Sequence, residues 1–372
     1  MAERIRLGIV GCGGGTRVMY VPVLRYVEDF RVTALCDSDP AALERTASLL
    51  GFEGSLHTDY REMLARAPVD ALIIATPVFL HRQQVVEAAA AGKHVLCEKP
   101  MARTVAECDD MIGACDAAAV TLAVGFMKRF DKSMLCAKQL IDEGRLGPVH
   151  QLICDWRGGA FARHLRAPHH FWRGRLQTWG GIYQDHGSHT SDLSRWWLGE
   201  ITSVTAQCDI FGEGWEVENS AVATYRHAGG ATSLHLVGVG NKPLGERYEF
   251  DGDRAALEMS YGPGWSFASP EPFRMTLFED GGRRRTDVAP RNLGVLDEEL
   301  AASGRYKREL DHFGECIRTG RPALNSGEAG RKAIEAINAV YLSSYLQETV
   351  RLPLQQPVDL PEIFRAMQAR SV

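Results

Sequence analysis

The chain has 372 residues, more than one typical domain, and this length predicts two domains that each bury their own core. Hydrophobic residues make up 45% of the chain and charged residues 24%, as in ordinary globular proteins. The net charge of -5 indicates no basic surface for nucleic acid or an anionic membrane, so neither partner is expected.

Targeting and redox signals predict a cytoplasmic protein. The first residues lead directly into a short apolar strand with no signal-peptide core, and no apolar run reaches the roughly 18 residues of a membrane span. The nine cysteines include no Cys-x-x-Cys pair, and several fall within expected strands. This pattern favours reduced core thiols over a disulfide framework or a zinc site.

Apolar strands alternate with helical segments through the first third of the chain. Helical patterns follow the glycine turn up to Leu24, start at Asp39-Pro40, and cover His81–Ala91 and Thr104–Ala118. Such alternation predicts a doubly wound parallel sheet with helices on both faces, over residues 1–125. The expected strands are Ile5–Val10, Val32–Cys36, Ala71–Ala75, His94–Cys97 and Val120–Gly125.

The pattern changes after Gly125. From Ile201 to Thr286 short alternating segments broken by Gly, Asn and Pro predict antiparallel strands of one large open sheet. We therefore expect a second α/β domain over residues 126–372. Its other expected elements are a helix at Lys132–Glu143, a strand at Val149–Trp156, a loop at Gly158–Gly181, and helices at Arg305–Thr319 and Glu328–Glu348.

The turn after the first strand predicts dinucleotide binding. It follows a strand and opens a helix, the context in which glycines let the backbone approach a pyrophosphate. Thr16 replaces the third glycine of the motif, unless Gly15 takes that place in a shifted register. The turn residues that we expect at the cofactor are Gly11, Gly13, Gly14, Gly15 and Thr16.

Asp37 ends the second expected strand, near the spacing of a carboxylate that binds the ribose 2′-hydroxyl of a dinucleotide. It would repel a 2′-phosphate, and Ser38 supplies no compensating cation, so NAD is favoured over NADP. The alternative is an ordinary Asp that caps the next helix, although Asp39 already fills that role.

The strand His94–Cys97 ends on Glu98-Lys99-Pro100. A lysine at the carboxyl end of such a strand faces the crevice where open α/β sheets bind ligands. In isolation the same tripeptide is more often a solvated loop.

Together with this tripeptide, a series of ordered motifs resembles the glucose-fructose oxidoreductase, inositol dehydrogenase and rhizopine-catabolism (Gfo/Idh/MocA) family. The likeness covers nearly the whole chain, and Gly125–Asp131 is most similar to the inositol dehydrogenase branch. Val78 departs from the family, which usually has Asn there. The other motifs are Ala75-Thr76-Pro77 with His81, Gly180-Gly181, Asp185-x-Gly187-x-His189-x-x-Asp192, Gly199, His312-Phe313, Gly320 and Asn325-x-Gly327.

The resemblance implies a Rossmann domain joined to an α/β domain, with a homodimer or homotetramer formed through the C-terminal sheet. It implies oxidation or reduction of a sugar or cyclitol carbon by Lys99, Asp185 and His189. It further implies that the cofactor site includes Ala75, Thr76, Pro77, His81, Glu98 and Lys99.

The three proposed catalytic residue types suit this chemistry. An imidazole with a pKa of about 6.5 can exchange a proton near neutrality, so His189 would be the acid/base. Asp185 precedes it by four positions, on one face of a helix, and would orient it. Lys99 would donate a hydrogen bond to the reacting oxygen. A capping cluster and a zinc site that includes His186 are the alternatives, and we expect no metal because no third ligand is evident.

The expected substrate contacts lie mainly in and around the loop Arg157–Arg175, where cations and histidines alternate with aromatic rings, as on sugar-binding surfaces. A solvated loop is the alternative. Asp192 would position substrate or lie exposed on its helix, and Trp196-Trp197 would be core or subunit contact. The expected substrate contacts are Lys99, Lys128, Arg129, Trp156, Arg157, His164, Trp172, Asp185 and His189.

The sequence thus predicts an NAD-dependent dehydrogenase that acts on a secondary alcohol of a cyclitol or pyranose, inositol-like in its sharper form. One alternative is an NADP-dependent ketosugar reductase, against which Asp37 argues. The other is a non-catalytic NAD-binding sugar sensor, against which the presence of Lys99, Asp185 and His189 argues.

Overall fold

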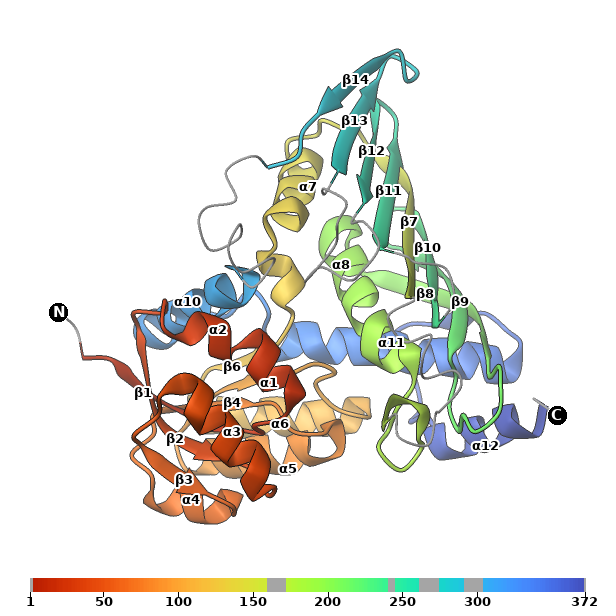
Figure 1. Ribbon diagram of the computed structural model, residues 1–372. Helices are drawn as coiled ribbons and strands as arrows, with labels where there is room; N and C mark the ends of the chain where they lie inside the picture. Colours follow the sequence, from red (N-terminus) through yellow and green to blue (C-terminus); the bar gives the residue numbers. More distant parts are fainter. Residues whose placement is uncertain (1–2, 159–171, 240–244, 261–273, 291–303, 371–372) are drawn as a thin grey trace. The chain divides into compact units, whose positions relative to one another are not determined.

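The computed structural model describes residues 3–158, 172–239, 245–260, 274–290 and 304–370 (Figure 1). Within these residues the chain forms two compact units, the first drawn from Met1–Phe130 and Val295–Arg331 and the second from Asp131–Gly294 and Lys332–Val372. The first unit therefore also takes in a late segment of the chain, which sequence analysis assigned to the second domain.

The first unit is built on a six-stranded sheet with the order β3-β2-β1-β4-β5-β6, in which all neighbouring pairs are parallel. This confirms the predicted doubly wound parallel sheet. The short strand β3 was not predicted, since three residues are too few to show a period of two. The strands are β1 (Ile5–Val10), β2 (Phe30–Cys36), β3 (Ser55–His57), β4 (Ala71–Ile74), β5 (His94–Cys97) and β6 (Leu122–Val124).

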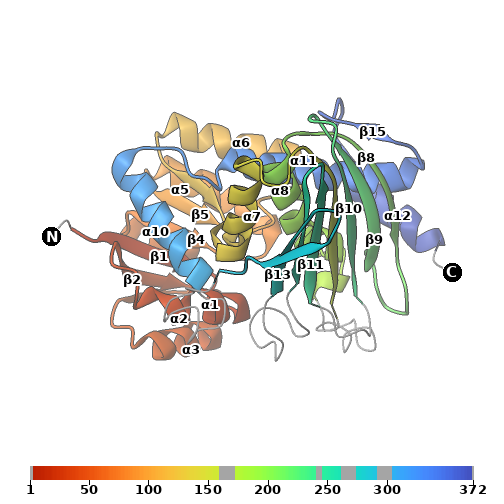
Figure 2. The ribbon, with the colours of Figure 1, turned by 90° about the horizontal axis from the view of Figure 1, so that it is seen from above.

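Helices lie on both faces of this sheet, with α1, α2 and α3 on one face and α5 and α6 on the other (Figure 2). Because both faces are covered, strands such as β4 are buried at every residue, which explains their continuous apolar sequence. The helices of this unit are α1 (Gly14–Met19), α2 (Val21–Leu24), α3 (Pro40–Leu50), α4 (Tyr60–Arg66), α5 (Val78–Ala90), α6 (Val105–Ala117) and α10 (Gly304–Thr319).

Side chains at helix starts explain two of these boundaries. The Asp39 carboxylate accepts a hydrogen bond from the Ala41 amide at 3.0 Å and caps α3, as the sequence predicts. Pro22 occupies the first turn of α2 and has no N–H to continue a preceding helix. The single helix expected up to Leu24 is therefore divided at Tyr20 into α1 and α2.

Tertiary contacts explain why α10 belongs to the first unit. Phe313 of α10 stacks on Phe30 of β2 with ring centroids 5.8 Å apart. Farther along, Asn325 bonds to the edge strand β6, since the Val124 amide donates to its carbonyl at 2.7 Å. Its side-chain amide donates back to the Val124 carbonyl at 2.6 Å. These contacts join residues 201 or more positions apart, and no local sequence pattern reports them.

The second unit is built on a nine-stranded sheet with the order β14-β13-β12-β11-β7-β10-β9-β8-β15. β7 and β10 pair in parallel and the other neighbours are antiparallel, which confirms the predicted mostly antiparallel sheet. The strands are β7 (Val149–Gly158), β8 (Ile201–Asp209), β9 (Ser220–His227), β10 (Thr232–Val239), β11 (Glu246–Gly252), β12 (Ala255–Ser260), β13 (Arg274–Glu279), β14 (Arg284–Asp287) and β15 (Val350–Arg351).

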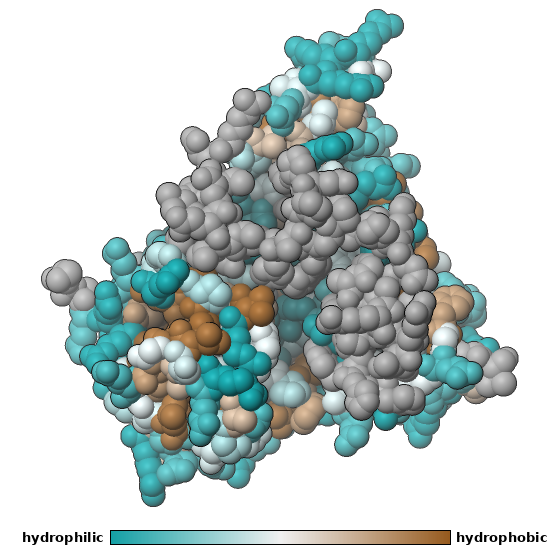
Figure 3. Space-filling view, viewed as in Figure 1, coloured by the Kyte–Doolittle hydropathy of each residue, from teal (hydrophilic) through white to brown (hydrophobic). Residues whose placement is uncertain are grey.

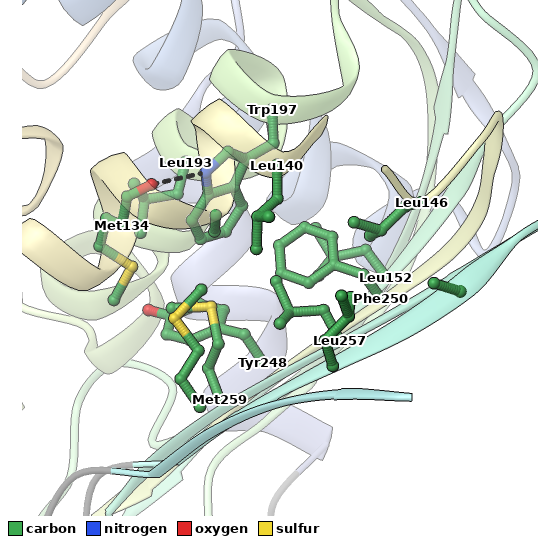
Figure 4. Close-up of a cluster of buried hydrophobic side chains, with 14 of the residues drawn as sticks. Met134, Leu140, Leu146, Leu152, Leu193, Trp197, Tyr248, Phe250, Leu257 and Met259 are labelled. Carbon is green, nitrogen blue, oxygen red and sulfur yellow. Dashed lines mark hydrogen bonds between the residues drawn. The ribbon is translucent and has the colours of Figure 1, made fainter. Parts of the chain in front are cut away.

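Two helices cover one face of this sheet. Side chains of α7 (Lys132–Asp142) and α8 (Ser188–Leu198) pack with those of β7, β11, β12 and β13 into one apolar core (Figure 4). Trp197 is buried in this core and donates to the Met134 carbonyl at 3.4 Å, so it is a core residue, one of the two roles expected for it. The remaining helices are α11 (Gly327–Leu346), whose first residues belong to the first unit, and α12 (Leu360–Arg370).

The edge of the nine-stranded sheet ends in a polar hairpin. All four residues of the edge strand β14 are exposed, and they include Arg284 and Arg285. The space-filling view shows that the β13–β14 hairpin is strongly hydrophilic (Figure 3). Charged side chains on an exposed edge strand disfavour pairing with strands of other molecules.

All nine cysteines are free thiols, and eight of them are buried. Burial raises the pKa of Cys12 to about 12, so the thiol stays protonated near neutrality. Within the described residues, no helix combines the length and the apolar character needed to cross a membrane.

Glu218 fixes the start of the helical segment that carries Asp185. Its side chain is fully buried, and one carboxylate oxygen accepts hydrogen bonds from the Tyr183 amide at 2.7 Å and the Tyr341 hydroxyl at 2.9 Å. Gly181 has φ +119, and a Cβ there would lie 2.6 Å from the other oxygen, so this position requires glycine. Burial raises the pKa of Glu218 to about 8.

The Glu218→Gln variant should lose part of the pH dependence of stability. In the folded protein the carboxyl keeps its proton up to about pH 8, whereas in the unfolded chain it ionises at about pH 4.3. The unfolded chain therefore binds fewer protons than the folded protein between these values, and rising pH favours unfolding. The unfolding free energy of the variant, relative to wild type, should rise across this window and then level off.

Urea unfolding at about pH 5, 6.5, 8 and 9 measures this difference. The control is Glu213→Gln, which changes an exposed carboxylate of the same unit. A difference between Glu218→Gln and wild type that does not vary with pH would contradict the prediction.

Candidate active site

The cofactor residues expected in the first unit meet at one edge of its sheet. Strands β1 and β4 are neighbours, while the chain runs outward from them to β2 and β3 on one side and to β5 and β6 on the other. In open parallel sheets such a switch point forms a crevice at the carboxyl ends of the strands. The glycine turn follows β1, Asp37 follows β2, Ala75 follows β4 and Glu98-Lys99 follows β5.

The first glycine of the turn is required by its contact with β4. Gly11 has φ +95, and a Cβ there would lie 2.5 Å from the carbonyl oxygen of Ala75. An L side chain would therefore be both strained and in collision with backbone. At Gly13 and Gly14 a Cβ would meet nothing within 4 Å, so these two glycines leave open space in front of α1.

Thr16 takes the place of the third glycine and closes the turn. Its side chain is buried, and its hydroxyl donates to the Gly11 carbonyl at 2.5 Å. A Cβ at Gly15 would come within 3.0 Å only of the end of the flexible Met19 side chain. The replacement thus adds a hydrogen bond within the turn, while Gly15 is a solvent-exposed residue of α1.

Asp37 connects the glycine turn to the end of β2. One carboxylate oxygen accepts a hydrogen bond from the Cys12 amide at 2.7 Å, and the other accepts one from the Asp39 amide at 2.9 Å. Asp39 caps α3, so the alternative interpretation of Asp37 as the helix cap is wrong. Its side chain is half-buried, and a carboxylate can accept further hydrogen bonds.

His81 joins the loop after β4 to the loop after β5. Its Nε2 lies 2.8 Å from the Thr76 carbonyl and its Nδ1 lies 3.1 Å from the Pro100 carbonyl. The ring is buried, and burial lowers its pKa, so the neutral form is favoured. These contacts indicate that His81 holds the two loops, while Thr76 itself donates to Gln84 on α5 at 2.6 Å.

At the end of β5 the Glu98 side chain is buried and Lys99 is half-buried. Both oxygens of the Glu98 carboxylate accept hydrogen bonds, one from the Tyr20 hydroxyl at 2.6 Å and one from the Lys99 amide at 3.0 Å. The sequence analysis missed Tyr20, because nothing in its local pattern connects it with a strand end almost 80 residues later.

The pair Lys128-Arg129 lies in a 3₁₀ turn (Met127–Phe130) after β6, and both side chains are buried. Arg129 donates to the Leu324 carbonyl at 2.7 Å, within the same unit. This bond ties the Arg129 side chain to the backbone of the segment that follows α10.

In the second unit Asp185 lies in a π-helical turn, Tyr183–Gly187, that leads directly into α8. π-helical turns are rare and often mark functional sites. Asp185 forms an ion pair with Arg173 and lies 3.2 Å from Nε2 of His186. The sequence analysis did not assign these two partners to Asp185, because it expected His189 as the partner and because Arg173 lies 12 positions earlier, in a separate turn.

The expected acid/base His189 lies in the first turn of α8, and its side chain is 1% exposed. Asp192, one turn farther along α8, is 2% exposed, so the alternative of an exposed helix aspartate is wrong. Within the described residues, no group of three His, Cys, Asp or Glu side chains could hold a metal ion.

The other residues expected at the substrate lie on or after β7. Trp156 is buried and stacks on His186, with ring centroids 3.5 Å apart and planes 10° apart. Arg157 is exposed and pairs with the buried Asp155 on the same strand at 2.5 Å. His164 lies outside the described residues. Trp172 begins a short 3₁₀ turn that also contains Arg173.

Comparison with known proteins gives two family matches. The oxidoreductase family model with an NAD-binding Rossmann fold matches residues 5–126, and the GFO/IDH/MocA C-terminal domain model matches residues 134–258. Among individual proteins, D-apiose dehydrogenase of Paraburkholderia graminis is 26% identical over 358 residues, 94% of this chain and 90% of that protein. Myo-inositol 2-dehydrogenase of Thermotoga maritima is 28% identical over 337 residues, 89% of this chain and 93% of that protein.

The solved structures agree with these matches. Aldose-aldose oxidoreductase from Caulobacter crescentus, complexed with glycerol, superposes with a TM-score of 0.79 at 28% identity and covers 94% of this chain and 100% of that one. The matched models cover the Rossmann sheet and most of the second sheet, in the order that the sequence motifs predict. The first unit is thus an NAD-binding Rossmann domain, and the chain is an oxidoreductase that belongs to the Gfo/Idh/MocA family.

Proposed function

We propose that this protein is an NAD-dependent dehydrogenase that oxidises a secondary alcohol of a cyclitol or sugar. The observation that carries the proposal is the half-buried Lys99 at the end of β5, beside the switch point where the glycine turn and Asp37 meet. The matched relatives named for D-apiose and myo-inositol support a polyhydroxylated substrate.

The residues of the first unit fit a dinucleotide. The space in front of Gly13 and Gly14 would admit a pyrophosphate close to the backbone, and any side chain there would fill it. Asp37, with its carboxylate already positioned by the Cys12 amide, would bind the ribose hydroxyls and repel a 2′-phosphate. We therefore propose NAD rather than NADP. The backbone of Ala75, Thr76 and Pro77 and the Glu98-Lys99 segment complete the proposed site, with His81 as its support.

The nicotinamide ring, when bound, supplies the hydride chemistry, and the chain must supply orientation and a proton acceptor. We assign proton transfer to His189, because imidazole exchanges protons near neutrality. Lys99 would donate a hydrogen bond to the reacting oxygen and stabilise its developing negative charge. Asp185, which is paired with Arg173 and close to His186, would be the third member of the catalytic set and would orient His189.

For the substrate we propose contacts with Lys128, with Trp156 and its stacked partner His186, and with Arg157. Trp172 and His164 belong to the same proposal. Cationic donors would bind hydroxyl groups, while an aromatic face would pack on the apolar face of a sugar ring. Arg129 would act indirectly, because it bonds to the Leu324 carbonyl.

The proposal is tested by NADH formation with a panel of inositols, pentoses, hexoses and sugar acids, run in parallel with NADP. We expect turnover with at least one cyclitol or sugar, and a kcat/KM for NAD about tenfold or more above that for NADP, because Asp37 repels the added phosphate. Faster reduction of ketosugars with NADPH would favour the reductase alternative. NAD binding without turnover on any substrate would favour the sensor.

The catalytic assignment is tested by Lys99→Met and His189→Asn. Each should lower kcat about 100-fold or more, since one removes a donor to the reacting oxygen and the other removes the proton acceptor. Matched controls are Lys93→Met, at the amino end of β5, and His150→Asn, an exposed histidine of the second unit. A near wild-type kcat in either active-site variant would contradict the role assigned to that residue.

We further propose that one face of the nine-stranded sheet, the face that carries Val222 and Leu236, forms a homodimer or homotetramer contact. Val222 of β9 is 44% exposed, and its cross-strand partner Leu236 of β10 is half-buried, so the face carries adjacent apolar side chains. Light scattering should give a mass of two or four chains of 41.0 kDa, and Val222→Lys with Leu236→Lys should lower it. A wild-type mass of one chain would contradict the proposal.

A further inference from the structure

The carboxylate of Glu98 has little freedom in the folded protein. Its side chain is 7% exposed, and its two oxygens accept hydrogen bonds from the Tyr20 hydroxyl at 2.6 Å and the Lys99 amide at 3.0 Å. Gly125, directly after β6, lies against the carboxylate, since a Cβ there would come within 2.9 Å of it. The carboxylate therefore joins the backbone of Lys99 to the hydroxyl of Tyr20.

Tyr20 belongs to the segment that follows the glycine turn. It is the C-terminal cap of α1 and precedes α2, and its side chain is fully buried. Its amide donates to the Thr16 carbonyl at 3.0 Å, and the Thr16 hydroxyl in turn closes the turn on Gly11. A continuous series of hydrogen bonds thus connects the glycine turn with the end of β5.

A second buried carboxyl group, Glu309 of α10, lies near Glu98. Glu309 is fully buried and accepts a hydrogen bond from the Asn325 side chain at 3.1 Å. Burial and the charge of Glu98 hold the pKa of Glu309 well above its usual range, which favours its neutral form. Glu98 accepts a hydrogen bond at each of its two oxygens, from the Tyr20 hydroxyl and the Lys99 amide.

We propose that Tyr20 is a positioning residue that acts through Glu98 to set the position of Lys99. The Tyr20 hydroxyl fixes one oxygen of the carboxylate, and the other oxygen then fixes the backbone of Lys99 next to the reacting carbon. The inference deepens the proposed function and rests on the assignment of Lys99 as a catalytic residue.

The physical reason lies in the cost of a buried carboxylate that loses a donor. Hydrogen bonds to charged groups are worth more than neutral ones, and a buried carboxylate with one donor fewer would turn toward other partners. Such a rotation would release the Lys99 amide. Lys99 would remain present but would occupy its productive position for a smaller fraction of the time.

The test compares Tyr20→Phe with Tyr306→Phe. The two rings pack edge to face with centroids 5.7 Å apart, and both are almost fully buried. Within the described residues the Tyr306 hydroxyl has no hydrogen-bond partner, so each variant removes one buried hydroxyl but only one removes the bond to Glu98. Tyr20→Phe should lower kcat about tenfold, with KM for NAD and melting temperature within the range of Tyr306→Phe.

A double-mutant cycle decides whether Tyr20 acts through Glu98. Glu98→Met keeps an unbranched side chain of similar length but removes both acceptors. If the inference holds, Tyr20→Phe lowers kcat in the wild-type background and causes no further loss in the Glu98→Met background. Equal losses in both backgrounds would overturn the inference, as would a Tyr20→Phe effect no larger than that of Tyr306→Phe.

Failure of the inference can be separated from failure of the proposed function. If Lys99→Met abolishes turnover while Tyr20→Phe leaves kcat unchanged, only the positioning role is wrong. If Lys99→Met retains wild-type turnover, the catalytic assignment on which the inference rests is wrong. Equilibrium binding of NAD, followed by protein fluorescence, should be the same for wild type, Tyr20→Phe and Tyr306→Phe, because no cofactor-binding residue is changed.

Discussion

The close approach of Gly11 to the carbonyl of Ala75 is the constraint on which the Rossmann unit depends. The Ala75 amide donates to the Val10 carbonyl at 2.8 Å, and only a glycine after Val10 leaves room for β1 and β4 to end side by side. Because these strands meet at the switch point of the sheet, the turn after β1 and the loop after β4 face the same crevice. Thr16 completes this arrangement, because its hydroxyl bonds to the Gly11 carbonyl.

In the second unit the buried carboxyl group of Glu218 fixes the start of the helical segment that carries Asp185. Glu218 accepts the amide hydrogen bond that starts the π turn, and that turn presents Asp185 and His186 before α8 begins. His186 in turn stacks on Trp156 of β7, so the helix is tied to the sheet through an aromatic contact as well as through the apolar core. The polar residues Asp185 and His186 thus lie in a helical segment whose start is bonded to Glu218 and whose continuation, α8, packs into the apolar core.

Two buried carboxyl groups, Glu218 and Glu309, have raised pKa values and lie in the units that carry the proposed site residues. Burial favours the neutral form of each, while the carboxylates proposed to act, Asp37 and Asp185, have amide or cationic partners. The carboxylates proposed to contact a ligand thus have partners that stabilise the ionised form, whereas the carboxyl groups buried in the packing favour the protonated form. Relatives named for D-apiose and for myo-inositol match 94% and 89% of this chain, so proteins that are alike over most of this chain carry the names of different substrates.

The sequence by itself determined the alternation of strands and helices, the glycine turn, the acid after β2, the lysine after β5 and the family. These features depend on local periodicity and short-range spacing, which a chain carries in its residues. Only the tertiary structure decided that α10 packs on the first unit, that Tyr20 bonds to Glu98, and that Asp185 pairs with Arg173 in a π turn. Those features join positions far apart in the chain, or change helical spacing by one residue, and burial and hydrogen-bond geometry set them rather than any local pattern.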